Sequence, residues 1–491
     1  MERVLAGLQP EKCFYYFEEI SRIPRSSFKE EAVSNYLVDF AKKRGLAVVQ
    51  DEAWNVIINK PATPGYENRK TIMLQGHTDM VCVKDEGVEH DFDKDPIPMY
   101  IDGDYIRARG TTLGADNGTA VCLMLALLDS DDIEHPAIQC IFTSAEEVGL
   151  VGAAKLDPHC LEGEYLINLD GGHIDQLLLS SAGGSVHTFI ISRDSHETKE
   201  KEAGAGLGIR IGGLTSGHSG SLSYRCFGNA NKLMGNILSR LKENFPYQLA
   251  SMEGGIKMNA IAKEAKAVLA VPKESVEAVK AELSEIRACI LKEYAVTDPE
   301  LTISWFDQPV PDQVYSEKAA NQLIDLLDLL QDGPFKFMEP EKNMAKTSNN
   351  IGIVEETKED TVKITCLMRS NSDYEHDELI RKTRKLSSML GITHEIRDRS
   401  AAWEFQPGCS LVEQISSLYE KEYGEKPKIT MTHGGVEPGV IIGLGKQVGK
   451  SIQAVNFGVT SHGAHTTKED LFIPAMEETF EWLKTILKNL D

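Results

Sequence analysis

The sequence predicts an α/β fold: a mostly parallel sheet with helices on both faces, interrupted by an inserted α+β domain. Strand-like segments alternate with helix-like segments before about residue 180 and again after about residue 401, and this alternation is typical of a parallel sheet. Between these parts, apolar and polar residues alternate around a polar, Gly-rich stretch, which favours antiparallel strands. We therefore expect one domain of residues 1–182 and 401–491 and an inserted domain of residues 183–400.

The elements of the first part follow from the spacing of its apolar residues. Residues 30–43 have helical spacing, with Val33, Leu37 and Phe40 on one stripe. Residues 119–128 are almost wholly apolar and predict a buried helix. Short apolar runs predict strands, in chain order, at residues 48–49, 56–58, 71–74, 138–143 and 165–169.

The later elements with a clear pattern are helices. Within the insert, residues 276–294 and 319–330 have the spacing of long amphipathic helices. After the insert, residues 411–423 predict another helix. The chain closes with a helix over residues 474–490, which begins at a proline, a residue favoured in the first helical turn.

The composition argues against several classes of protein. The 491 residues carry a net charge of −23, from 52 basic and 75 acidic side chains, whereas nucleic acids and anionic membranes require a cationic surface. The longest apolar run, residues 120–128, is far shorter than the ~20 residues of a membrane-spanning helix. Nine cysteines without a CxxC pair indicate reduced thiols, and the N-terminal segment lacks the apolar stretch of a secretory signal. We expect a cytoplasmic protein without nucleic-acid or membrane partners.

The first candidate site residues follow the strand predicted near residue 74. His77 and Asp79 are two positions apart, so on an extended chain their side chains face the same way. A carboxylate beside a metal-bound histidine typically accepts its second ring N–H and fixes its tautomer. An isolated His-x-Asp is more often a histidine that caps a strand end, so this motif alone is weak evidence.

Acidic residues follow the neighbouring elements in the same way. Asp116 lies in a polar turn before the buried helix, Glu146 and Glu147 follow one strand, and Asp170 follows the next. The carboxyl ends of parallel strands meet in one crevice. There, acidic groups repel each other unless a cation compensates their charge. Each cluster taken singly is typical of an acidic surface turn, but together they favour a metal site.

The adjacent glutamates and the C-terminal histidines refine this hypothesis. Metal-assisted hydrolysis needs one carboxylate on the ion and another that is free to move a proton, and Glu146 and Glu147 can divide these roles. His465 offers a further nitrogen ligand, with His462 as its competitor, and spacing alone does not decide between them. Histidine and carboxylate ligands without cysteine suit zinc or another divalent first-row metal. Two ions with one bridging carboxylate would use His77, Asp116, Glu147, Asp170 and His465.

These motifs resemble those of the dinuclear zinc peptidases, a family that includes aminoacylases, carnosinases and bacterial dipeptidases. The resemblance extends from about residue 13 to the C-terminus, including the insert. It depends on the order and spacing of GHTDMVCVK at 76–84, TTLGADNGTAV at 111–121, TSAEEVGLVGA at 143–153, LINLDGG at 166–172 and GAHTTKED at 463–470.

The resemblance implies a role for each motif residue. It implies two divalent ions, zinc or else Mn²⁺ or Co²⁺, with Asp116 as the bridge and a cis peptide bond after it. It implies that Asp79 orients His77 and that Glu146 is the general base. The remaining ligands would be His77 and Asp170 for one ion, and Glu147 and His465 for the other.

The resemblance also implies how a substrate is bound. His218 would contact the substrate carbonyl or its developing oxyanion, Asn259 and Arg369 the carboxylate end, and Glu437 the free amine. Such anchors would measure out a dipeptide with a free amino terminus, Xaa-His dipeptides of the carnosine type among them. The insert would act as a lid and form a homodimer.

Two alternatives stay open at this level. One is another hydrolase with the same metals: an aminoacylase, a deacetylase or an aminopeptidase. Glu437 and the long insert argue for a free amino terminus. The other is a non-catalytic, metal-stabilised binding protein, against which the retention of Glu146 argues. Departures from the family pattern concern the substrate preference and lie at residues 466–469, where Thr-Thr-Lys-Glu stands for Ser-Pro-Asp-Glu, and at Gly171, Gly172 and Pro438.

Overall fold

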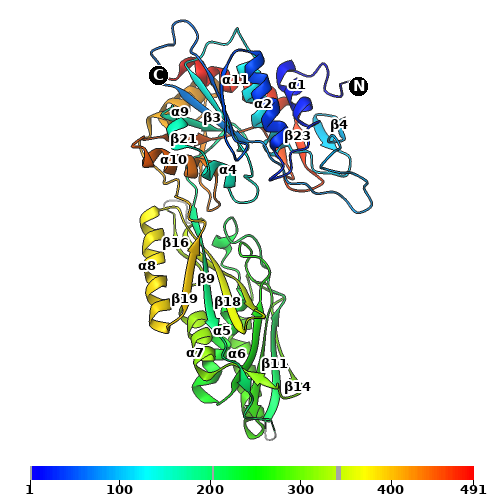
Figure 1. Cartoon of the computed structure of the whole chain (residues 1–491), viewed down its shortest axis with the longest axis vertical. Coiled ribbons are helices and arrows are strands. Elements are labelled where there is room, and N and C mark those ends of the chain that lie inside the picture. The colour runs from blue at the N-terminus through cyan, green and yellow to red at the C-terminus, as the bar shows by residue number, and fades with distance from the viewer. Residues whose placement is uncertain (1–2, 202–203, 339–343) are drawn as a thin grey trace. The chain divides into compact units, whose positions relative to one another are not determined.

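The computed structural model describes residues 3–201, 204–338 and 344–491, which form two compact units (Figure 1). Unit 1 comprises Met1–Ser180, Trp403–Met431 and Val436–Asp491, and unit 2 comprises Ser181–Ala402 and Thr432–Gly435. The sequence pattern assigns residues 432–435 to the first domain, but in the structure they pack with unit 2. The reason is local, because His433 bonds to Ser348 and Asn371 of that unit.

Unit 1 is built on an eight-stranded sheet whose central strands are parallel. β3 pairs in parallel with β6 and β7, and β7 pairs in parallel with β21. The strand order is β1 (Ala47–Gln50), β2 (Val56–Lys60), β6 (Ile138–Thr143), β3 (Ile72–His77), β7 (Tyr165–Asn168), β21 (Gln453–Asn456), β8 (Gln176–Leu178) and β20 (Lys428–Thr430).

Helices cover both faces of this sheet, as the sequence predicts. Neighbouring residues of β3 illustrate the two layers: Leu74 lies in a core with α1 and α3, and Met73 lies in a second core with α10. On the first face lie α1 (Glu11–Ile20), α2 (Glu31–Lys43), α3 (Ala115–Leu128), α9 (Ser410–Tyr423) and α11 (Ile473–Asn489). On the second lies α10 (Glu437–Gln447), in contact with the short α4 (Val151–Ala154) and the 3-10 turn Pro158–Cys160.

A small antiparallel sheet completes unit 1. Its strands are, in order, β22 (Ser461–His462), β23 (Asp470–Phe472), β5 (Tyr105–Ala108) and β4 (Met99–Asp102). The pairing of β23 with β5 joins the C-terminal loop to a hairpin near residue 105. The sequence pattern predicts neither this hairpin nor α10, in which Pro438 and three glycines disguise the helical spacing.

Unit 2 is an antiparallel sheet with helices packed against it, which is the α+β architecture expected for the insert. The strand order is β14 (Thr302–Gln308), β11 (Gly204–Gly212), β13 (Ala265–Pro272), β12 (Gln248–Gly254), β17 (Ala345–Glu356), β18 (Thr361–Ser370), β9 (Gly183–Ser192) and β19 (Thr393–Arg397), with β16 (Gly333–Phe337) beside β17. A separate ribbon pairs β10 (His196–Glu197) with β15 (Gln313–Val314). The helices are α5 (Ala230–Asn244), α6 (Val276–Glu293), α7 (Glu317–Leu329) and α8 (Asp373–Leu390), and the 3-10 turns are Ser223–Arg225 and Lys273–Ser275.

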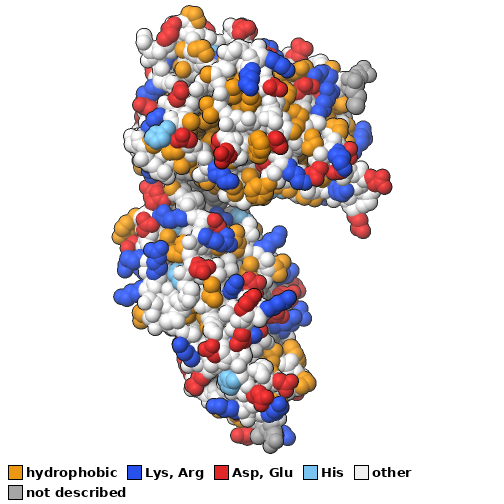
Figure 2. Space-filling model, viewed as in Figure 1, with side chains coloured by type: hydrophobic (Ala, Val, Ile, Leu, Met, Phe, Trp, Pro, Cys, Tyr) orange, Lys and Arg blue, Asp and Glu red, His pale blue; other side chains and the backbone are white. Residues whose placement is uncertain are grey.

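The surface carries mixed charge. On the face shown in Figure 2, basic and acidic side chains are interspersed over both units. Within the described residues, no helix combines the length and the apolar character needed to cross a membrane.

Candidate metal centre

The predicted ligands lie where the central strands of unit 1 end. β3 ends at His77, Glu146 and Glu147 follow β6, and Asp170 follows β7. These three strands are adjacent and parallel, so their carboxyl ends deliver the side chains to one edge of the sheet.

Asp116 reaches the same edge from the start of α3. Gly114 takes a left-handed conformation with φ of 73°, and Asp116 has non-helical angles of φ −80° and ψ 106°. The peptide bond between Asp116 and Asn117 is cis, as the resemblance implies. The side-chain amide of Asn117 donates to Asp170 Oδ1 at 2.9 Å, so the two acidic loops are joined directly.

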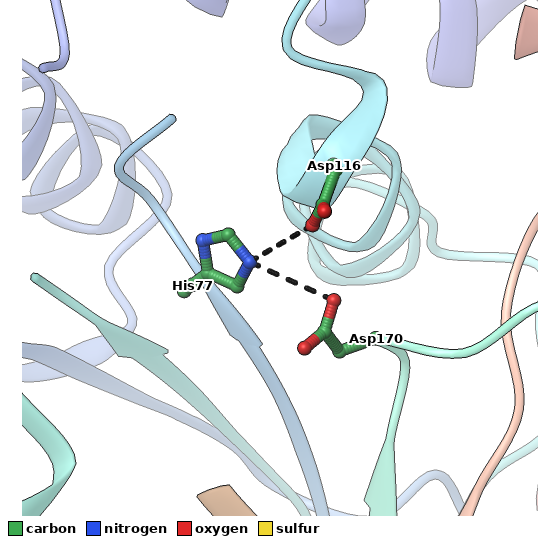
Figure 3. Close-up of side chains that lie close together, drawn as sticks. All are labelled: His77, Asp116 and Asp170. Atoms are coloured by element: carbon green, nitrogen blue, oxygen red, sulfur yellow. Dashed lines mark hydrogen bonds and ion pairs between the residues drawn. The ribbon is translucent and has the colours of Figure 1, made fainter. Parts of the chain in front are cut away.

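Asp116 lies between two groups of side chains, and Figure 3 shows the first of them. His77 Nε2 lies 3.1 Å from Asp116 Oδ1 and 3.6 Å from Asp170 Oδ1. On the other side, His465 Nε2 lies 3.2 Å from Asp116 Oδ2 and 2.9 Å from Glu147 Oε2. The two oxygens of Asp116 therefore face different partners, which is the arrangement a bridging carboxylate requires.

The structure distinguishes the two C-terminal histidines. His462 lies on β22, where its Nδ1 bonds to Asp470 Oδ1 at 2.9 Å. Among the described residues, His465 belongs to a group of potential ligands and His462 does not.

The charges at this edge are poorly balanced by the protein alone. Burial raises the pKa of Asp170 to about 6, and the nearby Asp116 carboxylate adds to the rise. Hydrogen bonds to Asp116 and Glu147 raise the pKa of His465 to about 10. The carboxylates therefore favour a positive charge between them. A metal cation would supply this charge, and His465 could then stay neutral.

The residues fit a pair of divalent ions. Three groups of potential ligand atoms each lie within 4.8 Å of one another: His77 with Asp116 and Asp170, His77 with Glu146 and Glu147, and Asp116 with Glu147 and His465. Glu147 Oε1 is buried without a hydrogen-bond partner in the described structure, and such an atom needs a ligand. The donors are all nitrogen and oxygen, as zinc and other first-row ions accept.

Asp79 contacts more than His77. Its carboxylate lies 3.4 Å from His77 Nδ1, while its backbone oxygen lies closer to the same nitrogen, at 3.1 Å. The carboxylate also accepts the backbone N–H groups of Glu146 and Glu147, at 3.0 and 3.3 Å. Asp79 thus joins the end of β3 to the turn that carries both glutamates.

A row of buried amides crosses the sheet beneath this centre and ends at Glu437. The side chain of Asn456 donates to Asn168, Asn168 donates to Gln75, and Gln75 donates to Glu437 Oε2. Thr143 donates to the same oxygen at 2.9 Å. Glu437 Oε1 has no partner in the described structure, and burial raises the pKa of this carboxyl to about 7. An ammonium group would donate a hydrogen bond to the free oxygen and would balance the negative charge of the Glu437 carboxylate.

Two buried residues for which the sequence predicts no role, Glu469 and Arg25, hold the backbone of the Asp116 loop. Glu469 accepts the backbone N–H groups of Leu113 and Gly114 at 2.8 and 2.9 Å. The guanidinium of Arg25 donates to the carbonyls of Thr78 at 3.0 Å and of Gly114 at 2.5 Å. Pattern reading misses such residues because their partners are far away in the sequence.

In unit 2, Arg369 is a buried guanidinium for which the described residues provide no anionic partner. It lies on β18, and its Nε is buried without a hydrogen-bond partner in the described structure. Burial lowers its pKa to about 10, and among the described residues no carboxylate forms an ion pair with it. A buried, uncompensated guanidinium is suited to bind a carboxylate ligand, which it can pair bidentately.

His218 and Asn259 lie near each other in the same unit. His218 Nδ1 accepts the backbone N–H groups of Gly220 and Ser221 at 3.2 and 3.1 Å, which leaves its ring proton on Nε2 as a donor. An isolated bridge pairs His218 with Ala260, the residue after Asn259, and the Asn259 side chain is exposed. Burial and the charge of Arg369 lower the pKa of His218, which favours a neutral donor.

The sequence matches the family described as Peptidase family M20/M25/M40 over residues 73–489. The chain belongs to this family. It is therefore an enzyme, a metallopeptidase, and the resemblance noted in its motifs is confirmed. A purely structural metal site in a binding protein does not agree with this membership.

Individual relatives are similar along the whole chain. The cytosol non-specific dipeptidase of Escherichia coli strain K12 is 32% identical over 99% of this chain and 99% of its own length. The structure of aminoacylhistidine dipeptidase from Vibrio alginolyticus gives a TM-score of 0.89 at 30% identity and covers 99% of this chain and 98% of that chain. Aminopeptidase PepT from Bacillus cereus shares the fold, with a TM-score of 0.55, 17% identity, and coverage of 98% and 99%.

Proposed function

We propose that this metallopeptidase is a cytosolic dipeptidase that hydrolyses dipeptides with a free amino terminus, Xaa-His dipeptides among them. The observation that carries the proposal is that two oppositely charged side chains each keep one polar atom without a partner. Glu437 Oε1 and Arg369 Nε are both buried without a hydrogen bond in the described structure. Glu437 offers a cation site within unit 1 and Arg369 an anion site within unit 2, and a dipeptide zwitterion carries one group of each charge. Both similar dipeptidases, from Escherichia coli and Vibrio alginolyticus, support this substrate class.

The metal ligands in this proposal are Asp116 and the four residues around it. His77 and Asp170 would hold one ion, Glu147 and His465 the other, and Asp116 both. We propose zinc, because the ligands combine imidazole and carboxylate, although manganese and cobalt accept the same donors. When bound, the two ions supply Lewis-acid chemistry, which makes a water molecule more acidic and polarises the scissile carbonyl.

Glu146 performs the proton transfers. Its carboxylate lies among the potential ligand atoms of His77 and Glu147, and among the described residues its side chain accepts no hydrogen bond. Burial raises the pKa of Glu146, and the charges of Asp170 and Glu437 add to the rise. A carboxylate with a raised pKa takes a proton from the attacking water and returns it to the departing amine.

The remaining groups bind and orient the substrate. Glu437 binds the free amine, and Arg369 and Asn259 bind the terminal carboxylate. His218 donates its Nε2 proton to the oxygen of the tetrahedral intermediate, where negative charge develops. N-acylated substrates lack the ammonium group that Glu437 would bind, so we expect them to be turned over poorly.

Replacement of the base tests this function. Glu146→Gln keeps the size of the side chain but removes the proton acceptor, so we expect both metal equivalents to remain while kcat falls by ~10²- to 10⁴-fold or more. The measurements are metal analysis of the purified variant and kinetics with Xaa-His, Xaa-Gly and N-acetylated substrates after loading with zinc, manganese or cobalt. A Glu146→Gln enzyme with full metal content and near-normal kcat contradicts the assignment.

The lid role of residues 183–400 and the homodimer stay predictions. Light scattering of the intact protein measures the mass directly. A monomer mass that does not change with concentration would end the dimer hypothesis.

A further inference from the structure

The backbone turn that carries the base and one metal ligand is held in an unusual way. We name residues 144–147 the base turn. All four of its consecutive backbone N–H groups donate to side chains from other parts of unit 1. The pairs are Ser144 with Asn55 Oδ1 at 3.0 Å, Ala145 with Glu30 Oε1 at 2.8 Å, Glu146 with Asp79 Oδ1 at 3.0 Å, and Glu147 with Asp79 Oδ2 at 3.3 Å.

The carbonyl groups of the base turn are bonded as well. Gly152 and Val151, at the start of α4, donate to the carbonyls of Ser144 and Ala145 at 3.1 and 3.0 Å. Asn55 connects the two ends, because its amide also donates to the Gly152 carbonyl at 2.9 Å. The backbone conformation of the turn is therefore fixed from both sides.

The conformation itself explains why the turn must be held. Ala145 has a φ of 47°, in the left-handed region, which is unfavourable for a residue with a side chain. Such a conformation persists only where surrounding interactions determine it. The Ala145 N–H, at the strained residue, is the one that Glu30 accepts.

Glu30 is a buried carboxylate, and its burial costs free energy. It precedes α2 and is 1% exposed. Its Oε1 accepts two backbone N–H groups, from Ala145 at 2.8 Å and from Phe28 at 3.0 Å. Among the described residues, no basic side chain pairs with it. Since burial of an unpaired carboxylate is expensive, a role beyond packing is the simplest account.

We propose that Glu30 is a positioning residue: by holding the Ala145 N–H, it sets where the base Glu146 and the metal ligand Glu147 lie. This inference rests on the proposed roles of these two glutamates. Small displacements of a base or ligand are costly in turnover because the reacting atoms must lie within a few tenths of an ångström of their productive positions.

The test compares three replacements of Glu30 in the full-length enzyme loaded with zinc. Glu30→Leu removes the acceptor, so kcat should fall by about 10- to 100-fold with KM changed less than about threefold. Dialysis against metal-free buffer should release close to one equivalent of zinc from this variant sooner than from the wild type. Glu30→Gln retains an acceptor oxygen and should recover most of kcat and of the bound zinc.

Glu30→Asp provides a second test in case the Glu30→Leu variant does not fold. It keeps the charge but withdraws the carboxylate by one methylene, so it should fold and still lose kcat by roughly tenfold. A Glu30→Asp enzyme with wild-type kcat and zinc retention would overturn the proposal.

Glu18, which also pairs with Arg22 at 2.6 Å, offers a control. It is another buried glutamate of unit 1, 3% exposed, and it accepts the backbone N–H groups of Val4 and Leu5 at 3.2 and 3.0 Å. Glu18→Leu should lower the melting temperature while zinc retention and kcat stay within about twofold of the wild type, because it holds the N-terminal segment and not the base turn.

Each outcome has a distinct meaning. If Glu30→Leu keeps both zinc equivalents and kcat within about twofold, or if Glu18→Leu loses as much as Glu30→Leu, the positioning role is wrong. Glu146→Gln separates this failure from failure of the proposed function. An inactive Glu146→Gln beside an unaffected Glu30→Leu removes only the positioning role, whereas an active Glu146→Gln removes the base assignment itself.

Discussion

The two units place histidines in opposite electrostatic environments. In unit 1, His77 and His465 face the carboxylates of the candidate metal centre, and this raises the pKa of His465 to about 10. In unit 2, burial lowers the pKa of His187 to about 3 and that of His376 to about 4. The same side chain is thus driven toward a positive charge in one unit and toward neutrality in the other.

The partners in unit 2 explain the difference. Ser185 Oγ bonds to His187 Nε2 at 2.8 Å and to His376 Nε2 at 2.7 Å, and His187 Nδ1 bonds to His394 Nε2 at 2.8 Å. Hydroxyl and imidazole groups bond to these ring nitrogens without favouring a charge, while His376 Nδ1 has no hydrogen-bond partner in the described structure. His394 also stacks on Phe189, with ring centroids 4.4 Å apart.

The comparison shows that partners, and not residue type, define a metal centre. Three histidines meet in unit 2, yet no group of potential metal ligands is found there among the described residues. The hydrogen bonds of that network are to hydroxyl and imidazole groups, whereas each histidine of the candidate centre lies within 3.2 Å of an aspartate or glutamate oxygen. The predictions below follow from this contrast.

The largest expected effect is the loss of a metal ligand. His465→Ala should lose one metal equivalent and lower kcat/KM by on the order of 10²- to 10³-fold, because the ion provides several kcal/mol of transition-state stabilisation. Metal analysis and kinetics on the purified variant measure both quantities.

Two histidine variants serve as controls for that prediction. His462→Ala should keep both metals, since its ring bonds to Asp470, and His187→Gln in unit 2 should keep both as well. A greater loss of metal in His462→Ala than in His465→Ala would show that the ligand is assigned wrongly.

A smaller effect is expected at the anion site of unit 2. Arg369→Met should raise KM for a dipeptide by about 10- to 100-fold, because a hydrogen-bonded charge pair contributes roughly 1.5–3 kcal/mol. Zinc content should not change, since Arg369 belongs to unit 2. The same dipeptide with an amidated C-terminus is the control, and its KM should respond much less. Equal increases for the two substrates would remove Arg369 as the carboxylate anchor.

The fold class and the candidate ligands could be predicted because they depend on local patterns. The alternation of strands and helices predicts the sheet, and acidic motifs at strand ends predict which side chains meet. The structure brings all five predicted ligands together around Asp116. The choice between His462 and His465 could not be made from spacing, because it depends on how the loop after β22 turns.

The supporting residues could not be predicted for a different reason. Glu469 bonds to Leu113 across 356 positions of sequence, and Glu30 bonds to Ala145 across 115. Glu30 has no local pattern that separates it from a surface acidic residue, and the motif that contains Glu469 does not indicate which distant backbone it contacts. The histidine network of unit 2 could not be predicted for the same reason, because its members lie on β9, β19 and α8, which are far apart in the sequence.

The prediction with the smallest expected effect on turnover concerns stability, and it tests whether the buried histidines of unit 2 are neutral in the folded chain. His187 and His376 are 0% exposed, and their pKa values in the folded chain, about 3 and about 4, lie below the unfolded value of ~6.5. The unfolded chain therefore binds more protons as the pH falls. Stability from these groups is fully present above pH ~6.5 and is lost progressively toward pH ~4.

Charges around the network modify this loss without reversing it. Arg384 lies near His187 and His394, and Arg399 lies near His376; both lower the histidine pKa values further. Asp373 and Asp377 act in the opposite direction on His376. Since burial is the largest cause for all three histidines, we expect the loss to persist in moderate salt, which screens the surface charges.

Denaturant unfolding at pH 7 and pH 5 measures the effect. The free energy of unfolding of the transition that includes unit 2 should fall by on the order of 4 kcal/mol between these pH values, about 2 kcal/mol for each of the two histidines. In His187→Gln the fall should shrink, because one titrating group is gone, while kcat at pH 7 stays unchanged. His196→Gln, on the separate ribbon of β10 and β15, is the control and should keep the wild-type pH dependence. If the free energy of unfolding of His187→Gln falls as much as that of the wild type, the histidine network does not make unit 2 sensitive to acid. The contrast between the two sets of histidines would then apply to metal binding alone.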